Sequence, residues 1–180
     1  YKKCYLNDFS VSVAPYAPVT LNANFTSLQP VSGDTIKPDP TPYNNNTIPF
    51  DPDDIIYGHT CSVSNMTDVV GNVQSQINYK KTFSRTPVYN IGSTNATSML
   101  LDSVESEMSI TSTGLENLIS INGDKLASDV VVELDNVDGD SVVQFRNLTM
   151  AAGARVLAEG YDINGGDTLS ASATIKQIDL

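Results

Sequence analysis

His59 is the single histidine of this 180-residue chain. A hydrolytic triad, or a metal site with several histidine ligands, would therefore have to be built around this one ring. Its neighbours, Tyr57-Gly58 and Thr60-Cys61, match no nucleophile motif. Catalysis of that kind needs a nucleophile, a base and a group that orients the base. We interpret His59 as structural, and we expect no catalytic residue.

Two acidic runs are the next candidates for chemistry. Residues 51–54 read Asp-Pro-Asp-Asp, and residues 135–140 read Asp-Asn-Val-Asp-Gly-Asp. Calcium prefers several oxygen ligands, but neither run has the order of an EF-hand loop, in which Asp or Asn recurs at every second position before a Gly. We interpret both runs as solvated turns, and we expect no metal site.

Other signatures of enzymes are missing from the sequence. Carboxylate pairs that hydrolyse glycosides usually lie among aromatic platforms for the sugar, and the chain has no Trp. It also has no Walker loop and no Gly-x-Gly-x-x-Gly sequence to cradle a phosphate. We therefore expect no cofactor and no enzymatic activity.

Cys4 and Cys61 are the only cysteines. They could form one disulfide, but a domain of this size with an ordinary core does not need one. No Cys-x-x-Cys or Cys/His spacing suggests zinc. The sequence leaves open whether the two cysteines are joined.

The charge balance excludes further classes of function. The chain has 10 basic and 21 acidic residues, a formal net charge of −11. No basic run exceeds the pairs Lys2-Lys3 and Lys80-Lys81, so there is no basic stripe to neutralise phosphates. No segment approaches the ~20 apolar residues needed to cross a bilayer. We expect neither specific nucleic-acid binding nor a membrane partner.

The composition indicates which elements position these residues. Val, Ile, Thr, Ser and Tyr are plentiful, whereas helix-forming residues rarely occur in helix-spaced clusters. We predict an all-β protein, an antiparallel β-sandwich or barrel with at most one or two short helices.

Alternation of apolar and polar residues locates the strands. Residues 4–28 alternate on both sides of a Pro-containing turn at 14–18, which predicts a β-hairpin with one buried face. Residues 29–54 lose the alternation, contain six prolines and predict a loop or arm. Further strands are predicted at residues 55–64, 73–83, 88–91, 100–113, 127–134 and 141–148. Arg85-Thr86-Pro87 is predicted to end the second of these.

The last part of the chain predicts a closing hairpin. Residues 154–163 and 169–178 alternate around a tip that contains Gly165-Gly166, and Gly-Gly supplies the positive φ that tight hairpin turns need. The best of the few helix candidates is a helical turn at residues 114–119.

The first and last hairpins are similar to one another. Residues 9–26 match residues 161–175 in spacing and in apolar positions. Two interpretations stay open. In one, the match is a true repeat and residues 1–28 close a unit that begins upstream; in the other, any two amphipathic hairpins look alike. We divide the chain into a hairpin at 1–28, an arm at 29–54 and a main β domain at 55–180.

Three segments carry a resemblance to a known family. Residues 73–93 read Val-Gln-Ser-Gln-Ile-Asn-Tyr-Lys-Lys-Thr-Phe-Ser-Arg-Thr-Pro-Val-Tyr-Asn-Ile-Gly-Ser. They resemble a segment of bacteriophage virion proteins in which a strand runs into an Arg-x-Pro-aliphatic-Tyr-x-aliphatic-Gly turn. A strand with acidic residues follows there, as in residues 104–108 (Val-Glu-Ser-Glu-Met). Residues 5–13 (Tyr-Leu-Asn-Asp-Phe-Ser-Val-Ser-Val) are similar to another segment of the same proteins.

The resemblance implies a structural protein of a tailed-phage virion, with the tail tube as first choice. Tube proteins are β-sandwich or barrel subunits that close into rings, usually hexameric, and stack into a channel for DNA. The implied partners are copies of the same chain and other virion proteins, with DNA at most passing through a lumen whose carboxylates repel it. The additional hairpin and arm exceed what a compact tube subunit needs, so a capsid decoration or neck protein stays an alternative.

Two alternatives come from other classes. One is a cell-surface adhesin or glycan-binding β module, in which the arm at 29–54 recognises a ligand. The other is a carbohydrate-active β-sandwich enzyme. We favour a self-assembling virion subunit in which exposed sheet edges and the arm bridge neighbouring copies.

Overall fold

The structure is a computed structural model that describes residues 2–29, 55–64, 76–113, 125–126, 128–135, 147–164 and 168–179. Every regular element in these residues is a β-strand, and they contain no helix. The predicted all-β class is confirmed. The arm beyond residue 29 and the helical turn at 114–119 lie outside the described residues.

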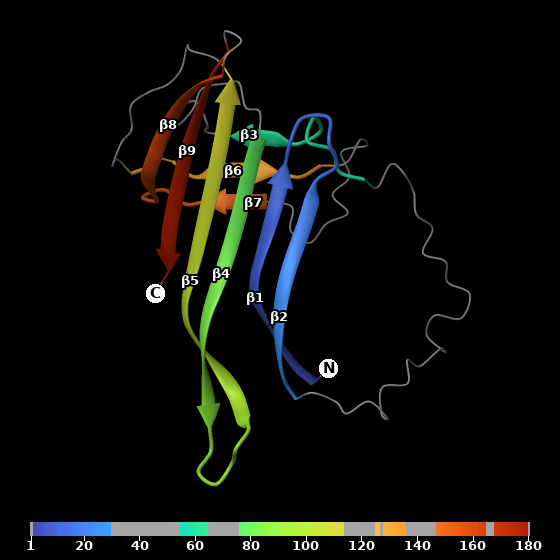
Figure 1. Cartoon of the computed structure of the whole chain (residues 1–180), viewed down its shortest axis with the longest axis vertical. Coiled ribbons are helices and arrows are strands. Elements are labelled where there is room, and N and C mark those ends of the chain that lie inside the picture. Colours follow the sequence, from blue (N-terminus) through green and yellow to red (C-terminus); the bar gives the residue numbers. More distant parts are fainter. Residues whose placement is uncertain are drawn as a thin grey trace, which may run out of the picture.

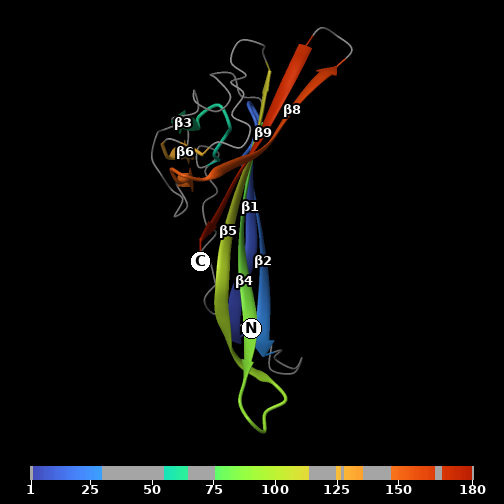
Figure 2. The same ribbon diagram turned by 90° about the vertical axis from the view of Figure 1, so that its left-hand side faces the viewer.

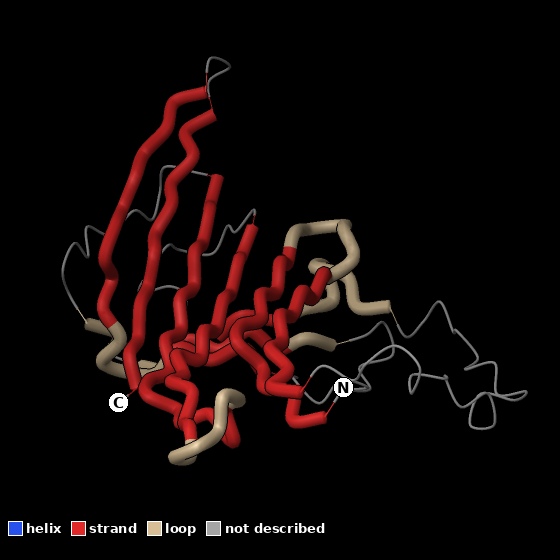
Figure 3. Tube along the Cα trace, turned by 60° about the horizontal axis from the view of Figure 1, so that its bottom comes forward, coloured by secondary structure: helices blue, strands red, loops and turns tan. Residues whose placement is uncertain are grey.

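Six strands form one antiparallel sheet in the order β2-β1-β4-β5-β9-β8 (Figure 1). Their bounds are Lys2–Val13 (β1), Thr20–Gln29 (β2), Gln76–Tyr89 (β4), Ala96–Thr113 (β5), Arg155–Asn164 (β8) and Thr168–Asp179 (β9). In Figure 3 these strands lie side by side as one broad layer.

Three short strands form a second antiparallel sheet in the order β3-β6-β7. Their bounds are Ser62–Ser64 (β3), Val130–Glu133 (β6) and Asn147–Met150 (β7). This small sheet lies against one face of the large sheet near its upper end, with its strands crossing those of the large sheet (Figures 1 and 2). The two layers make a sandwich-like fold, in which the small sheet covers only the upper end of the large sheet.

The core fills the space between the two sheets, where alternation directs apolar side chains inward. Five buried side chains follow one another as cross-strand partners across the large sheet: Val11, Tyr79, Met108, Ile175 and Val156. The small sheet contributes buried side chains of its own, among them Val130, Val132, Leu148 and Met150. The buried residues of β1, β4, β5 and β9 lie at alternate positions, as the period-two alternation of the sequence predicts.

The N-terminal hairpin forms as predicted and joins the large sheet. β1 pairs with β2 along its length and with β4 from Asp8 to Val13. Residues 2–29 thus form one edge of the sheet to which β4, β5, β8 and β9 also belong. The division into a hairpin, an arm and a main domain, and the internal repeat, stay predictions.

The strand predicted at residues 55–64 is too long, because only Ser62–Ser64 pairs as β3. The backbone of the preceding residues forms hydrogen bonds with the β1–β2 turn instead. Val19 N donates to Ile56 O at 2.8 Å, and Gly58 N donates to Ala17 O at 3.0 Å. The backbones are so close that a Cβ on Gly58 would lie 2.0 Å from the carbonyl oxygen of Ala14.

The predicted end of a strand at Arg85-Thr86-Pro87 is wrong, because β4 continues to Tyr89 and Pro87 pairs with Met99. The separate strand predicted at 88–91 is the end of β4. The physical reason is that β1 pairs with β4 only as far as Thr82. Beyond that point β4 has a neighbour on one side alone, and a strand edge tolerates the missing N–H of proline.

The remaining strands are found with different bounds: β5 begins at Ala96 rather than at residue 100, whereas β6 and β7 are shorter than predicted. β6 is Val130–Glu133 rather than 127–134, and β7 begins at Asn147, with residues 141–146 outside the described residues. The closing hairpin of β8 and β9 is confirmed. Its tip at 165–167 is outside the described residues.

Candidate functional site

His59 lies exposed in the segment that supports the β1–β2 turn. Its ring centroid is 5.6 Å from that of Tyr16, with the planes 24° apart, and 5.6 Å from that of Tyr57. The histidine thus takes part in an aromatic contact between two segments. Within the described residues, no group of three His, Cys, Asp or Glu side chains could hold a metal ion.

The acidic runs are only partly described. Residues 51–54 and 136–140 lie outside the described residues, but Asp135 is described and lies two residues after the end of β6. Its backbone oxygen accepts a hydrogen bond from Thr60 Oγ1 at 2.5 Å. Asp135 therefore connects the small sheet to the segment that carries His59.

Cys4 and Cys61 are both free thiols. Cys4 is exposed, whereas Cys61 is partly buried with its Sγ 3.4 Å from the carbonyl oxygen of Tyr57. Burial raises the pKa of the Cys61 thiol. Since the thiolate is the reactive form, we expect burial to slow the reactions of the Cys61 thiol.

The edge strand β2 carries an exposed apolar row, Leu21, Ala23 and Phe25, which we call the β2 apolar edge. Leu21 pairs with the buried Val11, so this row continues the core face of the sheet. Leu21 is nevertheless 53 % exposed and Phe25 is 64 % exposed. The prediction of one buried face is wrong for the β2 half of the hairpin, because the small sheet does not cover it (Figure 2).

The lower parts of β4 and β5 project beyond the rest of the sheet (Figures 1 and 2). β1 leaves β4 after Thr82 and β9 pairs with β5 only as far as Val104, so beyond these points the two strands pair with each other alone. We call this part, residues 83–103, the β4–β5 ribbon. Its exposed large apolar side chains are Val88, Tyr89, Ile91, Leu100 and Leu101.

The base of the ribbon is fixed to β1 by aromatic and cationic side chains. The Arg85 guanidinium lies 5.6 Å from the centre of the Tyr5 ring and 5.7 Å from that of Phe83. Farther along, Lys3 Nζ donates to the carbonyl oxygen of Thr97 at 2.8 Å. These contacts hold β1 against the ribbon where the β1–β4 ladder has ended.

The outer face of the large sheet is polar and carries both signs of charge. Lys80, Glu107 and Lys176 are successive partners across β4, β5 and β9, and Lys176 forms a salt bridge with Glu105. The pKa of Lys176 is raised, because Glu105 accepts its hydrogen bond and the charges of Glu105 and Glu107 favour the ammonium form. This face is not a uniform acidic surface in the described residues.

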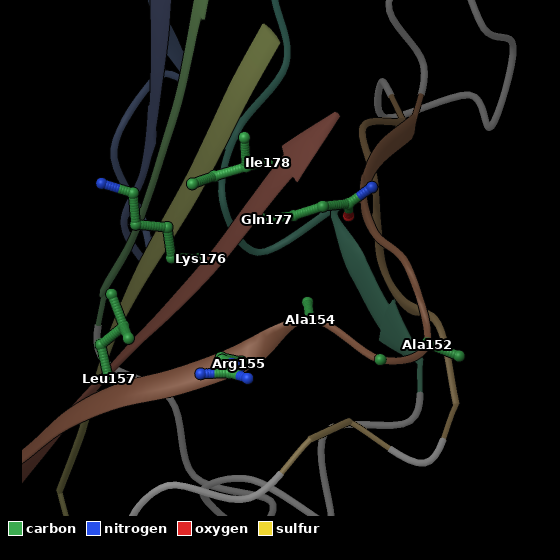
Figure 4. A pocket seen from close by; sticks show the side chains of 8 residues that line it. Ala152, Ala154, Arg155, Leu157, Lys176, Gln177 and Ile178 are labelled. Carbon is green, nitrogen blue, oxygen red and sulfur yellow. The ribbon is translucent and has the colours of Figure 1, made fainter. Parts of the chain in front are cut away.

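A pocket of about 540 Å³ lies where β8 and β9 part (Figure 4). The two strands pair as far as Arg155 and Lys176, and then diverge. Arg155 and Leu157 line one side, and Lys176 and Ile178 line the other. Ala151 N donates to Gln177 Oε1 at 2.9 Å and connects the two sides. We call this pocket the β8–β9 fork.

Comparison with known proteins gives no family for the chain. No protein-family model matches it, and no curated protein sequence is significantly similar to it. In the described part of the chain, no helix could span a membrane.

Sequence reasoning missed the exposure of the β2 apolar edge and the grouping of charges at the β8–β9 fork. Alternation placed Leu21 and Phe25 on the inner face, but the extent of the small sheet decides that they are exposed. Arg155 and Lys176 are 21 positions apart and become neighbours only through the β8–β9 register. Extending the register from the predicted tip at Gly165-Gly166 would have paired Arg155 with Gln177, because a bulge between Val156 and Ala158 shifts the register by one residue.

Proposed function

We propose that the chain is a structural subunit of a bacteriophage virion, in the first place of the tail tube, and that it works by assembling with copies of itself. In this proposal it is not an enzyme. Its partners are other copies and other virion proteins, its place is the virion, and DNA at most passes through a lumen without specific binding.

The β2 apolar edge is the observation that carries the proposal. Leu21 and Phe25 are large apolar side chains that stay more than half exposed on the outermost strand of the sheet. An exposed edge strand also has unpaired backbone N–H and C=O groups, which favour pairing with another chain. Exposed apolar surface next to such an edge is typical of protein–protein interfaces.

The β4–β5 ribbon supports the same proposal. A two-stranded ribbon buries little apolar surface by itself. This ribbon nevertheless carries exposed side chains such as Tyr89, Ile91 and Leu100. Contact with a neighbouring copy would remove that surface from water, at a gain of roughly 25 cal/mol for each Å² of apolar area buried.

The connection to virions comes from the sequence resemblance. The segment that resembles phage virion proteins covers all of β4 and most of the turn after it. Its Arg85 contacts β1 at the base of the ribbon, and its Pro87 and Tyr89 lie within the ribbon. The resembling motif therefore forms the β4 half of the ribbon and the start of its turn, and a projecting element suits a protein that contacts its neighbours.

Sedimentation velocity of the full chain over a concentration series tests the proposal. We expect wild type to form discrete oligomers, and the double variant Leu21→Ser/Phe25→Ser to associate at least about tenfold more weakly, since each large side chain contributes roughly 1.5–3 kcal/mol when buried. Asn22→Ser, which changes the opposite face of β2, is the matched control and should associate like wild type. A wild-type chain that stays monomeric at every concentration would contradict the proposal.

A further inference from the structure

The β8–β9 fork gathers positive charge in an acidic protein. Arg155 has Lys176 as its partner on one side and Lys125 as its bridge partner on the other. Partners in a ladder have neighbouring Cβ atoms on one face, and like charges placed in this way are destabilising. Three of the chain's 10 basic residues are therefore neighbours here, and two of them, Arg155 and Lys176, line the fork.

Only one of these three cations is neutralised within the described residues. Lys176 forms a salt bridge with Glu105, and Glu107 is its partner across β5 and β9. Arg155 and Lys125 are both exposed, and neither forms an ion pair with a described residue. The guanidinium is thus available to an anionic ligand, and a guanidinium can hold a carboxylate through two parallel hydrogen bonds.

The apolar side chains of the fork narrow the choice of ligand. Leu157 is 52 % exposed and Ile178 is 58 % exposed, and both line the pocket beside the cations. In Figure 4, Arg155 and Leu157 extend from one strand while Lys176 and Ile178 extend from the other. A peptide segment that carries both a carboxylate and an apolar side chain matches this combination. A nucleic-acid backbone would need an extended basic stripe instead.

We propose that the β8–β9 fork binds a carboxylate-bearing segment of a second copy of this chain, with Arg155 as the residue that holds the carboxylate. Charge complementarity selects this occupant, because every other copy has 21 acidic residues against 10 basic ones. Lys125 adds attraction, and Leu157 and Ile178 bury apolar surface of the incoming segment. This inference rests on the proposed self-assembly and gives it a second, electrostatic contact.

The test compares self-association of wild type, Arg155→Gln, Arg155→Lys and Lys80→Gln by sedimentation velocity at low and high NaCl. Loss of a charge-assisted hydrogen-bond pair should weaken association by at least about tenfold at low salt and reduce its salt dependence. Arg155→Lys should retain part of the affinity. Lys80→Gln, in the same cross-strand row but outside the pocket, should behave like wild type. Equal thermal unfolding of all four proteins excludes a folding defect.

If Arg155→Gln associated with the same affinity and salt dependence as wild type, the inference would be overturned. Complete absence of association in wild type would overturn the proposed function instead, and a peptide then tests the fork by itself. The probe is a labelled peptide of residues 49–56, Pro-Phe-Asp-Pro-Asp-Asp-Ile-Ile, followed by fluorescence anisotropy. Binding that Arg155→Gln abolishes would support an acidic-segment site. No binding, or preferential binding of a single-stranded oligonucleotide of equal charge, would overturn it.

Discussion

The Arg85 guanidinium lies over the ring of Tyr5, 5.6 Å from its centre, on the far side of the point where β1 and β4 stop pairing. Phe83 lies 5.7 Å from the same guanidinium, and Arg85 Nε donates to the carbonyl oxygen of Leu6 at 3.4 Å. One side chain thus joins β1 to the base of the β4–β5 ribbon. It does so beyond Thr82, where β1 and β4 are no longer paired through their backbones.

Replacing Arg85 with Ala should lower the free energy of unfolding by about 1 kcal/mol, since partly exposed cation–π contacts contribute roughly 0.5–2 kcal/mol each. Chemical denaturation followed by circular dichroism measures this. Arg85→Lys keeps the charge but loses the planar stacking, and it should fall between wild type and Arg85→Ala. Equal stability of all three proteins would show that the contact contributes nothing.

Gly58 and Gly92 should respond differently to alanine. A Cβ at Gly58 would lie 2.0 Å from the Ala14 carbonyl oxygen, a backbone atom that cannot move aside without breaking the β1–β2 turn. A Cβ at Gly92 meets nothing within 4 Å, so only its positive φ of 85° opposes the change. We expect Gly92→Ala to cost about 1 kcal/mol, and Gly58→Ala to cost clearly more.

Thermal unfolding of the two glycine variants checks this order. Gly92→Asn is a further control, because Asn tolerates a positive φ better than Ala does. If Gly58→Ala proved as stable as wild type, the close approach of residues 56–58 to the β1–β2 turn would be wrong.

The sequence predicted the core well because the core depends on local alternation. Val11 and Tyr79 are inward residues of their strands wherever those strands pair, so period two was enough to find them. The pairing of β5 with β9 joins residues about 70 positions apart, as in Met108 and Ile175, and no local pattern contains that information. Pro87 was misread for a related reason, since only the topology shows that β4 is an edge there.

The candidate surfaces were less predictable than the core. Whether Leu21 and Phe25 are buried depends on how far the small sheet extends over the large sheet. Its strands have only three or four residues, and strands this short give a weak alternation signal in the sequence. The two cations of the β8–β9 fork, Arg155 and Lys176, and the neighbouring Lys125 come from separate segments. These residues become neighbours through the β8–β9 register and the isolated bridge between Lys125 and Arg155. Composition encodes neither of these pairings.

The two cysteines should differ in reactivity. Cys4 is exposed, whereas burial raises the pKa of Cys61. At pH 8, iodoacetamide should therefore modify Cys4 faster than Cys61 in the native protein, and at similar rates in denaturant. Peptide mass spectrometry measures both rates. Faster labelling of Cys61, or a Cys4–Cys61 disulfide in the native protein, would contradict the structure.

The raised pKa of Cys61 also gives a pH dependence of stability. Because the folded-state pKa lies above the ordinary value of 9.0, the neutral thiol contributes stability below that pH. The contribution is lost as the pH rises through the folded-state pKa. Unfolding free energies measured between pH 8 and pH 11 should therefore fall more steeply for wild type than for Cys61→Ala. Parallel curves would contradict the assigned direction.

Negative-stain electron microscopy of the purified full chain, at concentrations where sedimentation shows association, tests the central claim most directly. The account predicts closed rings, or tubes of stacked rings, for wild type and for Asn22→Ser. It predicts their loss in Leu21→Ser/Phe25→Ser. Dispersed single particles of the mass of one chain at every concentration, for wild type as for the double variant, would contradict it.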